Sequence, residues 1–196
     1  GVLKHSILRY ADYGVLRIES SSVQVRDCRI ENNRIGIYVR NSAPLIRDTE
    51  VVNNQQYGIM LRNSEINLQD NIFRNNGDEG IYLRDCTNVS IKNNISRNNG
   101  EQGINLNSCP NSSVRSNTIR NNGGRGIDLN SCPNSTVQDN IIEGNSGTAI
   151  CLDSFSSTIG SNTVNDNGRN YIGVSGSLGS SSAVWGKFNQ DDLDVV

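Results

Sequence analysis

The chain has 196 residues, of which 34% are hydrophobic and 5% aromatic, and its formal net charge is -2. The hydrophobic content is low for a compact globular core, and the near-neutral charge argues against nucleic acid as a partner. No apolar run approaches the roughly 20 residues that a membrane-spanning helix needs, so we expect no membrane span.

The N-terminal residues already show a repeat. Residues 2–8 resemble residues 24–30 in their file of apolar residues, so we expect the chain to begin part-way through a coil. A bare coil edge exposes unpaired backbone donors and acceptors. We therefore expect this first coil to be covered, either by further coils of a longer protein or by another copy of the chain.

An asparagine that recurs every 21 to 23 residues dominates the rest of the sequence. A glycine-isoleucine motif keeps step with it, as in Gly58-Ile59-Met60-Leu61. Such a period, carried by short strands and polar turns, indicates a solenoid of stacked coils. The recurring asparagines are Asn33, Asn54, Asn76, Asn99, Asn122, Asn145 and Asn167. One buried file of isoleucines is expected to run through Ile37, Ile59, Ile81, Ile104, Ile127 and Ile150.

Each repeating unit contains three short strands, as the segment from Gly58 to Gly80 illustrates. Residues 59–62 and 66–69 alternate apolar with polar side chains, and residues 72–73 form a third apolar segment. Asn, Asp and Gly separate these segments, and they tolerate the left-handed backbone angles of tight turns. The spacing predicts about eight coils of 22–23 residues.

A second asparagine column marks another turn of the coil. Stacked inward amides can bond to the coils above and below, so we favour an internal hydrogen-bonded ladder over sugar binding for both columns. The members of the second column are Asn71, Asn94, Asn117, Asn140 and Asn162.

Three of the five cysteines, Cys86, Cys109 and Cys132, are also 23 residues apart and therefore stack. Parallel strands hold their Cβ atoms about 4.8 Å apart, farther than the roughly 3.8 Å of a disulfide. We favour free, buried thiols over a disulfide, and the absence of CxxC or Cys/His clusters argues against zinc.

The repeat fades near the C-terminus. We assign residues 1–174 to the repeats, with an incomplete first coil, and residues 175–196 to a separate C-terminal segment. This segment has a Gly/Ser-rich stretch (175–182), an expected capping strand around Trp185 (183–188) and an acidic tail (191–194).

Coils of this length, with three short strands and internal asparagine ladders, resemble the pectin-lyase-like superfamily. The Asn-x-x-Gly-Ile-x-Leu pattern is similar to its carbohydrate-binding/sugar-hydrolase and NosD-like repeats. The resemblance implies an all-β fold, a single-stranded right-handed parallel β-helix (solenoid). It also implies an extracellular or periplasmic location and polysaccharide as the ligand class. Activity does not follow, since the superfamily includes lyases, hydrolases, epimerases and inert spacers.

Outward-facing positions of the first strand are the candidate binding residues. Tyrosine rings stack on sugars, and arginine holds carboxylates in two-point contacts. We therefore expect an acidic polysaccharide to bind a patch in the N-terminal half. The alternative is an ordinary solvated strand surface. The patch consists of Tyr38, Arg40, Arg62, Tyr82 and Arg84.

Catalytic residues are not identified by the sequence. His5 is the only histidine, and the motifs of the superfamily's polygalacturonases and alginate epimerases are absent or incomplete. No cofactor is expected. Calcium is the one candidate, on carboxylates scattered over several coils. These are Asp78, Glu79, Asp85, Asp128 and Asp153.

Three functions remain open from the sequence. The favoured one is a non-catalytic module that binds polysaccharide or displays a long surface. The first alternative is a polysaccharide lyase, epimerase or hydrolase, or the β-helical part of one. The second is a self-assembling structural protein.

Overall fold

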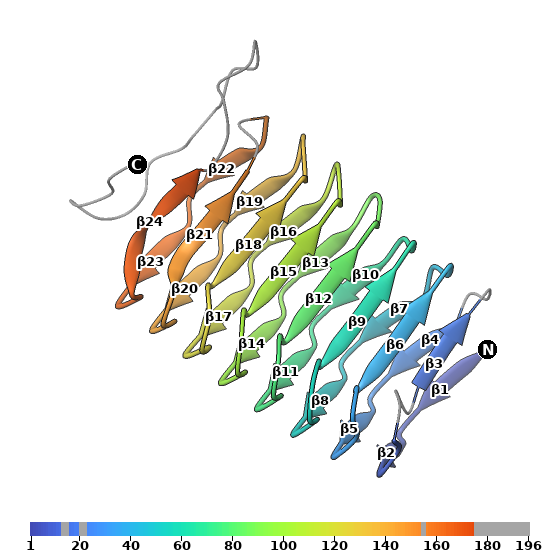
Figure 1. The fold of residues 1–196 in the computed structure, drawn as a ribbon. Helices are drawn as coiled ribbons and strands as arrows, with labels where there is room; N and C mark the ends of the chain where they lie inside the picture. The colour runs from blue at the N-terminus through green and yellow to red at the C-terminus, as the bar shows by residue number, and fades with distance from the viewer. Residues whose placement is uncertain (13–15, 20–22, 154–155, 175–196) are drawn as a thin grey trace.

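In the computed structural model the chain winds into a parallel β-helix (Figure 1), described for residues 1–12, 16–19, 23–153 and 156–174. Each coil contributes one strand to each of three sheets, called A, B and C in chain order. Within the described residues every regular element is a strand, and no helix there has the length and apolarity to cross a membrane. The predicted solenoid is confirmed.

All three sheets are eight-stranded and parallel. Sheet A consists of β1 (Val2–Lys4), β4 (Gln24–Arg26), β7 (Leu45–Arg47), β10 (Asn67–Gln69), β13 (Ser90–Lys92), β16 (Ser113–Arg115), β19 (Thr136–Gln138) and β22 (Thr158–Gly160). Sheet B consists of β2 (Ile7–Arg9), β5 (Arg29–Glu31), β8 (Glu50–Val52), β11 (Ile72–Arg74), β14 (Ile95–Arg97), β17 (Thr118–Arg120), β20 (Ile141–Glu143) and β23 (Thr163–Asn165). Sheet C consists of β3 (Leu16–Glu19), β6 (Ile37–Arg40), β9 (Ile59–Arg62), β12 (Ile81–Arg84), β15 (Ile104–Asn107), β18 (Ile127–Asn130), β21 (Thr148–Leu152) and β24 (Arg169–Val174).

The core is a set of aliphatic files that run the length of the solenoid. The predicted isoleucine file, from Ile37 to Ile150, is fully buried, and its members are register partners in sheet C. Each coil is too thin to bury these side chains by itself, so the coils above and below complete their burial. The expected match of residues 2–4 with 24–26 is also observed, as the pairing of β1 with β4.

Both predicted asparagine ladders are confirmed. In the first, Asn76 donates from Nδ2 to Oδ1 of Asn99 at 2.9 Å, and the backbone N–H of Asn76 reaches the same oxygen at 3.0 Å. In the second, Asn94 and Asn117 repeat this geometry at 3.1 and 2.8 Å. The buried amides thereby satisfy one another and the turn backbone, which removes the cost of burying them.

The cysteine column occupies the third corner of the coil. All three thiols are buried and free, as expected. The thiols also act as hydrogen-bonding groups, because Cys109 N–H donates to Sγ of Cys132 at 3.3 Å and Sγ of Cys109 lies 3.7 Å from the carbonyl oxygen of Leu83. A residue with positive φ, such as Ser108 at 52°, precedes each of these cysteines. The column is therefore a sulfur counterpart of the asparagine ladders.

The expected C-terminal features fall outside the described residues. They are the Gly/Ser-rich stretch at 175–182, the capping strand around Trp185 and the acidic tail at 191–194. The last described strand, β24, extends sheet C by pairing with β21.

Candidate functional site

The five sequence-predicted binding residues all lie on the outer face of sheet C, on strands β6, β9 and β12. Strand register places Arg40, Arg62 and Arg84 side by side, with Tyr38 and Tyr82 on either side of Met60. Because parallel strands are about 4.8 Å apart, these side chains form two columns across three coils. The structure thus brings all five together.

The expected exposure of Tyr38 is wrong. Tyr38 is only 8% exposed and forms a small outer cluster with Ile35 and Met60. Tyr57 and Tyr82 pack against this cluster, with their ring centroids 5.2 Å apart. Ile35 and Met60 pack against Tyr38 and bury it. The aromatic side chains that remain partly exposed on this face are Tyr57 and Tyr82. The sequence analysis missed Tyr57 because it precedes the strand, beside Gly58.

The arginines of the patch differ in their surroundings. Arg84 is exposed and lies 3.3 Å from Asp85, a weak surface ion pair. Arg40 is exposed and Arg62 is half-buried, and neither forms an ion pair with a described residue. In addition, the buried Nε of Arg62 has no hydrogen-bond partner. This face therefore carries positive charge that the described acidic residues leave uncompensated.

A polar cluster continues the same face toward the C-terminus, and its centre is Asn105 on β15. Asn105 donates from Nδ2 to Oε1 of Glu79 at 2.9 Å. Asp128, the register partner of Asn105 on β18, accepts a hydrogen bond from Nη1 of Arg125 at 2.9 Å. Glu79 and Asp128 are 9% and 3% exposed, so two carboxyl groups are nearly buried on an outer surface.

Burial is the first cause of the raised pKa of each of these carboxyl groups. At Glu79 the hydrogen bond from Asn105 opposes the rise in pKa, while Asp78 and Glu101 add to it. At Asp128 the charge of Arg125 opposes the rise. Burial and the neighbouring Glu79 also raise the pKa of the Tyr57 hydroxyl. Perturbed groups gathered on one face are a common mark of a functional site.

Unpartnered polar atoms concentrate on this face as well. Among the described residues, four buried side-chain nitrogen or oxygen atoms have no hydrogen-bond partner, and three of them lie here: Arg62 Nε, Asn105 Oδ1 and Asp128 Oδ1. The fourth is Arg26 Nε on sheet A. Buried polar groups are nearly always satisfied in native proteins, so the concentration on sheet C is informative.

The carboxylates that the sequence suggested for calcium are spread over several coils. Within the part of the chain that the structure describes, no three His, Cys, Asp or Glu side chains converge to hold a metal. Asp128 instead pairs with Arg125, and Asp153 accepts hydrogen bonds from Ser131.

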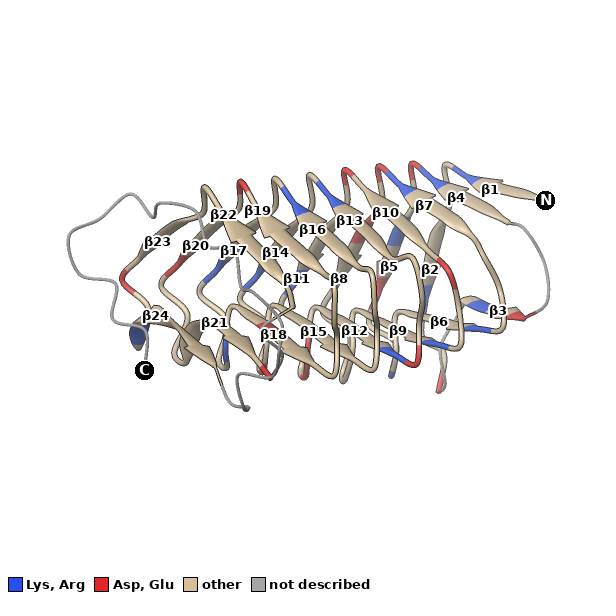
Figure 2. Ribbon diagram, turned by 90° about the horizontal axis from the view of Figure 1, so that it is seen from above, with Lys and Arg blue, Asp and Glu red and all other residues tan. Residues whose placement is uncertain are grey.

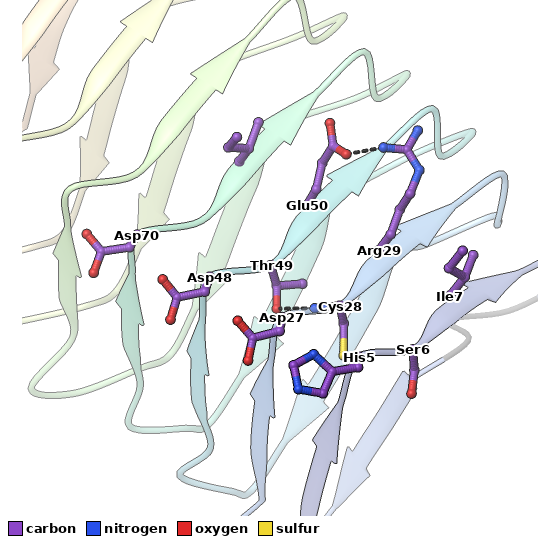
Figure 3. A pocket seen from close by; sticks show the side chains of 11 residues that line it. His5, Ser6, Ile7, Asp27, Cys28, Arg29, Asp48, Thr49, Glu50 and Asp70 are labelled. Carbon is purple, nitrogen blue, oxygen red and sulfur yellow. Dashed lines mark hydrogen bonds and ion pairs between the residues drawn. The ribbon is translucent and has the colours of Figure 1, made fainter.

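A groove lies elsewhere in the described residues, at the corner between sheets A and B. It has a volume of about 540 Å³ and is lined by His5 and a column of aspartates (Figure 3). Asp27, Asp48 and Asp70 each have a positive φ, which indicates a turn role. Asp48 forms an ion pair with Arg47, whose Nη1 lies 2.7 Å from Oδ2 of Asp48.

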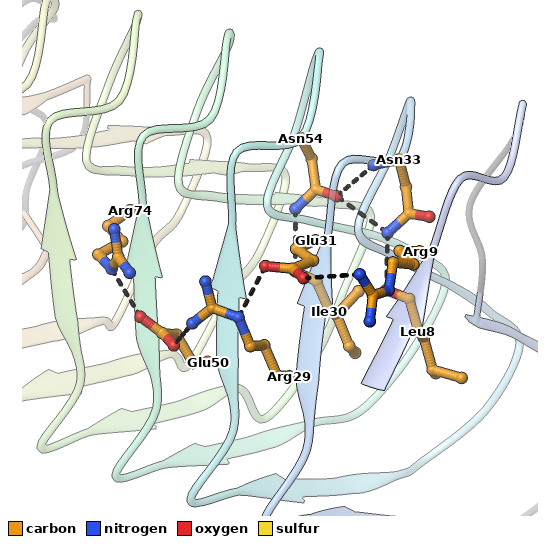
Figure 4. Close-up of polar contacts among 9 residues, drawn as sticks. All are labelled: Leu8, Arg9, Arg29, Ile30, Glu31, Asn33, Glu50, Asn54 and Arg74. Carbon is orange, nitrogen blue, oxygen red and sulfur yellow. Dashed lines mark hydrogen bonds and ion pairs between the residues drawn. The ribbon is translucent and has the colours of Figure 1, made fainter. Parts of the chain in front are cut away.

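The outer face of sheet B is occupied by an ionic chain (Figure 4). Arg29 contacts Glu31 at 2.7 Å and also contacts Glu50, which accepts a hydrogen bond from Arg74 at 2.6 Å. Arg9 extends the chain through Glu31 at 4.0 Å. The chain joins three arginines to two glutamates, so most of the charge at the N-terminal end of sheet B is engaged within the protein.

Sheet A presents a column of basic and amide side chains on its outer face. Lys and Arg recur along it from coil to coil (Figure 2). Arg115 is hydrogen-bonded to Gln138 in the next coil at 2.8 Å, so the amides relieve repulsion between stacked charges. The column members Arg26, Arg47, Gln69, Lys92, Arg115 and Gln138 are register neighbours.

Comparison with known proteins identifies the family. Residues 36–184 match the family described as "Right handed beta helix region". The chain belongs to this right-handed β-helix family. The match confirms the handedness implied by the sequence resemblance. A search of curated proteins found no match.

Among solved structures, this right-handed β-helix is similar to the Azotobacter vinelandii mannuronan C-5 epimerase AlgE6 A-module. The TM-score is 0.67 at 14% sequence identity, and the alignment covers 100% of this chain and 62% of that chain. The likeness therefore shows a shared fold, and this chain spans less than two thirds of the length of the epimerase module.

Proposed function

We propose that this right-handed β-helix binds an acidic polysaccharide along the outer face of sheet C, in the extracellular space or the periplasm. The observation that carries the proposal is the register of Arg40, Arg62 and Arg84 beside the Tyr57–Tyr82 pair. Arginines at strand spacing offer a row of carboxylate contacts, and half-buried tyrosines offer stacking surface for sugar rings. The similar solved structure acts on mannuronan, which supports a polyuronate as the ligand class.

A binding role without catalysis is the simpler form of this function. A chain lying across successive coils needs only repeated contacts at one spacing, and the coil supplies them. The lyase, epimerase or hydrolase alternative draws support from Glu79, a buried carboxyl group beside Tyr57. Incubation with mannuronan or polygalacturonate, followed by absorbance, chain-length and ¹H NMR measurements, separates the two, since NMR reports the C-5 configuration that an epimerase would change. A change in the polymer would support the enzyme.

Isothermal titration with mannuronan, polygalacturonate and dextran tests the binding proposal. We expect both polyuronates to bind and neutral dextran not to bind, with affinity falling as salt rises. Arg62→Ala should weaken binding at least about tenfold, since a hydrogen bond to a charged group contributes about 1.5–3 kcal/mol. The control Asp153→Ala, on a later coil, should change the affinity little. Binding that ignores both salt and Arg62 would refute the proposal.

A further inference from the structure

We propose that Glu79, Asn105 and Asp128 share one proton, and that this proton sets the affinity of the outer face of sheet C for an anionic chain. The inference rests on the proposed function for its ligand. Its first half, the shared proton, stands on the geometry of the three side chains alone.

The first step is the position of Asn105 between the two carboxyl groups. Asn105 lies on β15, Glu79 precedes β12 in the coil before, and Asp128 lies on β18 in the coil after. Its amide donates to Glu79 at 2.9 Å. Since Asn105 and Asp128 are register partners, their side chains leave the sheet side by side on the same face.

The second step concerns two side-chain oxygens that have no hydrogen-bond partner. Asn105 Oδ1 and Asp128 Oδ1 are both buried and both lack a partner. An ionised carboxylate and an amide oxygen are acceptors only, so neither can satisfy the other. A proton on Asp128 resolves this, because a carboxylic acid donates an O–H to the amide oxygen beside it.

The conclusion does not depend on which way the amide of Asn105 is turned. If it is rotated by half a turn, its NH₂ group faces Asp128 and its oxygen faces Glu79, and the proton then belongs on Glu79. An amide has one donating and one accepting end, so in either orientation a proton on one of the two carboxyl groups lets both of them bond to Asn105. The pair therefore carries one negative charge in place of two.

The surrounding charges favour retention of this proton. Asp78, Glu101 and the Tyr57 hydroxyl face Glu79, and burial raises the pKa of its carboxyl group. Asp128 faces Arg125, Asp153 and the thiols of Cys132 and Cys151, and a side-chain hydrogen bond with Asn130 lowers its pKa. Burial outweighs both the guanidinium of Arg125 and the hydrogen bond with Asn130, so the pKa of Asp128 is also raised.

The consequence for binding follows from charge. With the proton in place, Arg125 balances the remaining negative charge of the pair, and an anionic chain meets one negative charge fewer next to the arginine columns. When the proton leaves, a second negative charge appears on the same face and repels the chain. Uronate carboxylates have ordinary pKa values of about 4, so the ligand keeps its charge above about pH 5.

Two measurements test the inference independently. Carboxyl ¹³C NMR of the free protein should show one carboxyl group of the pair titrating well above its ordinary pKa. Titration with polygalacturonate should show affinity falling at least about fivefold between about pH 5 and about pH 8. A fivefold change needs a pKa difference of less than about one unit between the free and the bound protein. In Asp128→Asn, whose amide replaces the acid with a neutral donor, the change should be less than about twofold.

Variants guard against misfolding and against general charge effects. Glu79→Gln is the second test variant and should flatten the pH dependence in the same way. Asp139→Asn makes the same substitution at an exposed corner position and should keep the wild-type pH dependence. Circular dichroism confirms the fold of each variant.

The outcomes separate this inference from the proposed function. Two carboxyl groups that titrate at ordinary values, or equal pH dependence in wild type and both test variants, would overturn the shared proton. An observed shared proton with no polyuronate binding at either pH would refute the proposed function and the control of affinity, and would leave the proton itself established.

Discussion

Asn105 donates a hydrogen bond from its side-chain amide to Oε1 of Glu79, and the two residues are 26 positions apart in the chain. The buried asparagine side chains of the two ladders bond inside the solenoid, to the equivalent asparagine of the next coil. Asn105 bonds across the outer face, to a residue at a different position of the coil. This contact ties the outer surface of sheet C to the turn before β12 and creates the polar cluster beside the arginine columns.

Loss of one ladder amide should destabilise the protein much more than loss of a surface charge. Asn99→Ala removes the acceptor of Asn76 and the donor to Asn122, so buried groups lose their partners and the cost should be about 1–3 kcal/mol. The exposed control Lys92→Ala should cost less than about 0.5 kcal/mol. Urea unfolding of both variants measures this. Equal losses would contradict the structural role of the ladder.

A methyl group at Gly100 should disrupt the stacking of two coils. A Cβ there would lie 2.0 Å from the carbonyl oxygen of Gly77. Neither backbone segment can move away without breaking the backbone hydrogen bonds that join the two coils. We expect Gly100→Ala to lower stability by at least about 2 kcal/mol, as overpacking does. Gly173→Ala is the matched control, because its Cβ would meet its nearest neighbour at an ordinary 3.5 Å. Thermal melts that rank the two variants the other way would show that the coil spacing is wrong.

Stability should fall as the pH rises through the range in which Glu79 and Asp128 lose their protons. Their pKa values are raised above the ordinary 4.5 and 3.8, so the folded state holds protons that the unfolded chain releases. The contribution is therefore full below those ordinary values and is lost as the pH rises through the folded pKa values. Urea midpoints at a series of pH values should show a flatter profile for Asp128→Asn than for wild type. Parallel profiles would mean that Asp128 titrates normally.

Thiol reactivity should single out Cys151. Its side chain is only partly buried, whereas the other four cysteines are buried. A hydrogen bond with Cys109, together with burial, raises the pKa of Cys86, and a hydrogen bond with Cys132 leads the rise of the pKa of Cys109 to about 12. A hydrogen bond with Cys109 lowers the pKa of Cys132, and burial raises the pKa of Cys151. Access of the reagent to sulfur therefore decides the order, and iodoacetamide should label the partly exposed Cys151 first and the buried, stacked cysteines only after unfolding. Mass spectrometry of the native protein decides this, with Cys151→Ser as the control that removes the fast site.

The sequence by itself determined the architecture, because the architecture is periodic. Residues that share a phase of the repeat occupy the same place on successive coils, so Ile59 and Ile81, or Asn76 and Asn99, could be paired by counting. The two asparagine ladders, the free thiols and the register of the three arginines all follow from this one rule.

Only the tertiary structure decided what happens between different positions of the coil. Counting places Tyr38 outward, but its burial depends on the side chains of Ile35 and Met60 that close over it. Glu79 and Asn105 are 26 residues apart, not one coil of 23, so a search along columns misses their contact. Periodicity fixes where each backbone position lies, whereas the reach and direction of long side chains across the surface are set by packing in three dimensions.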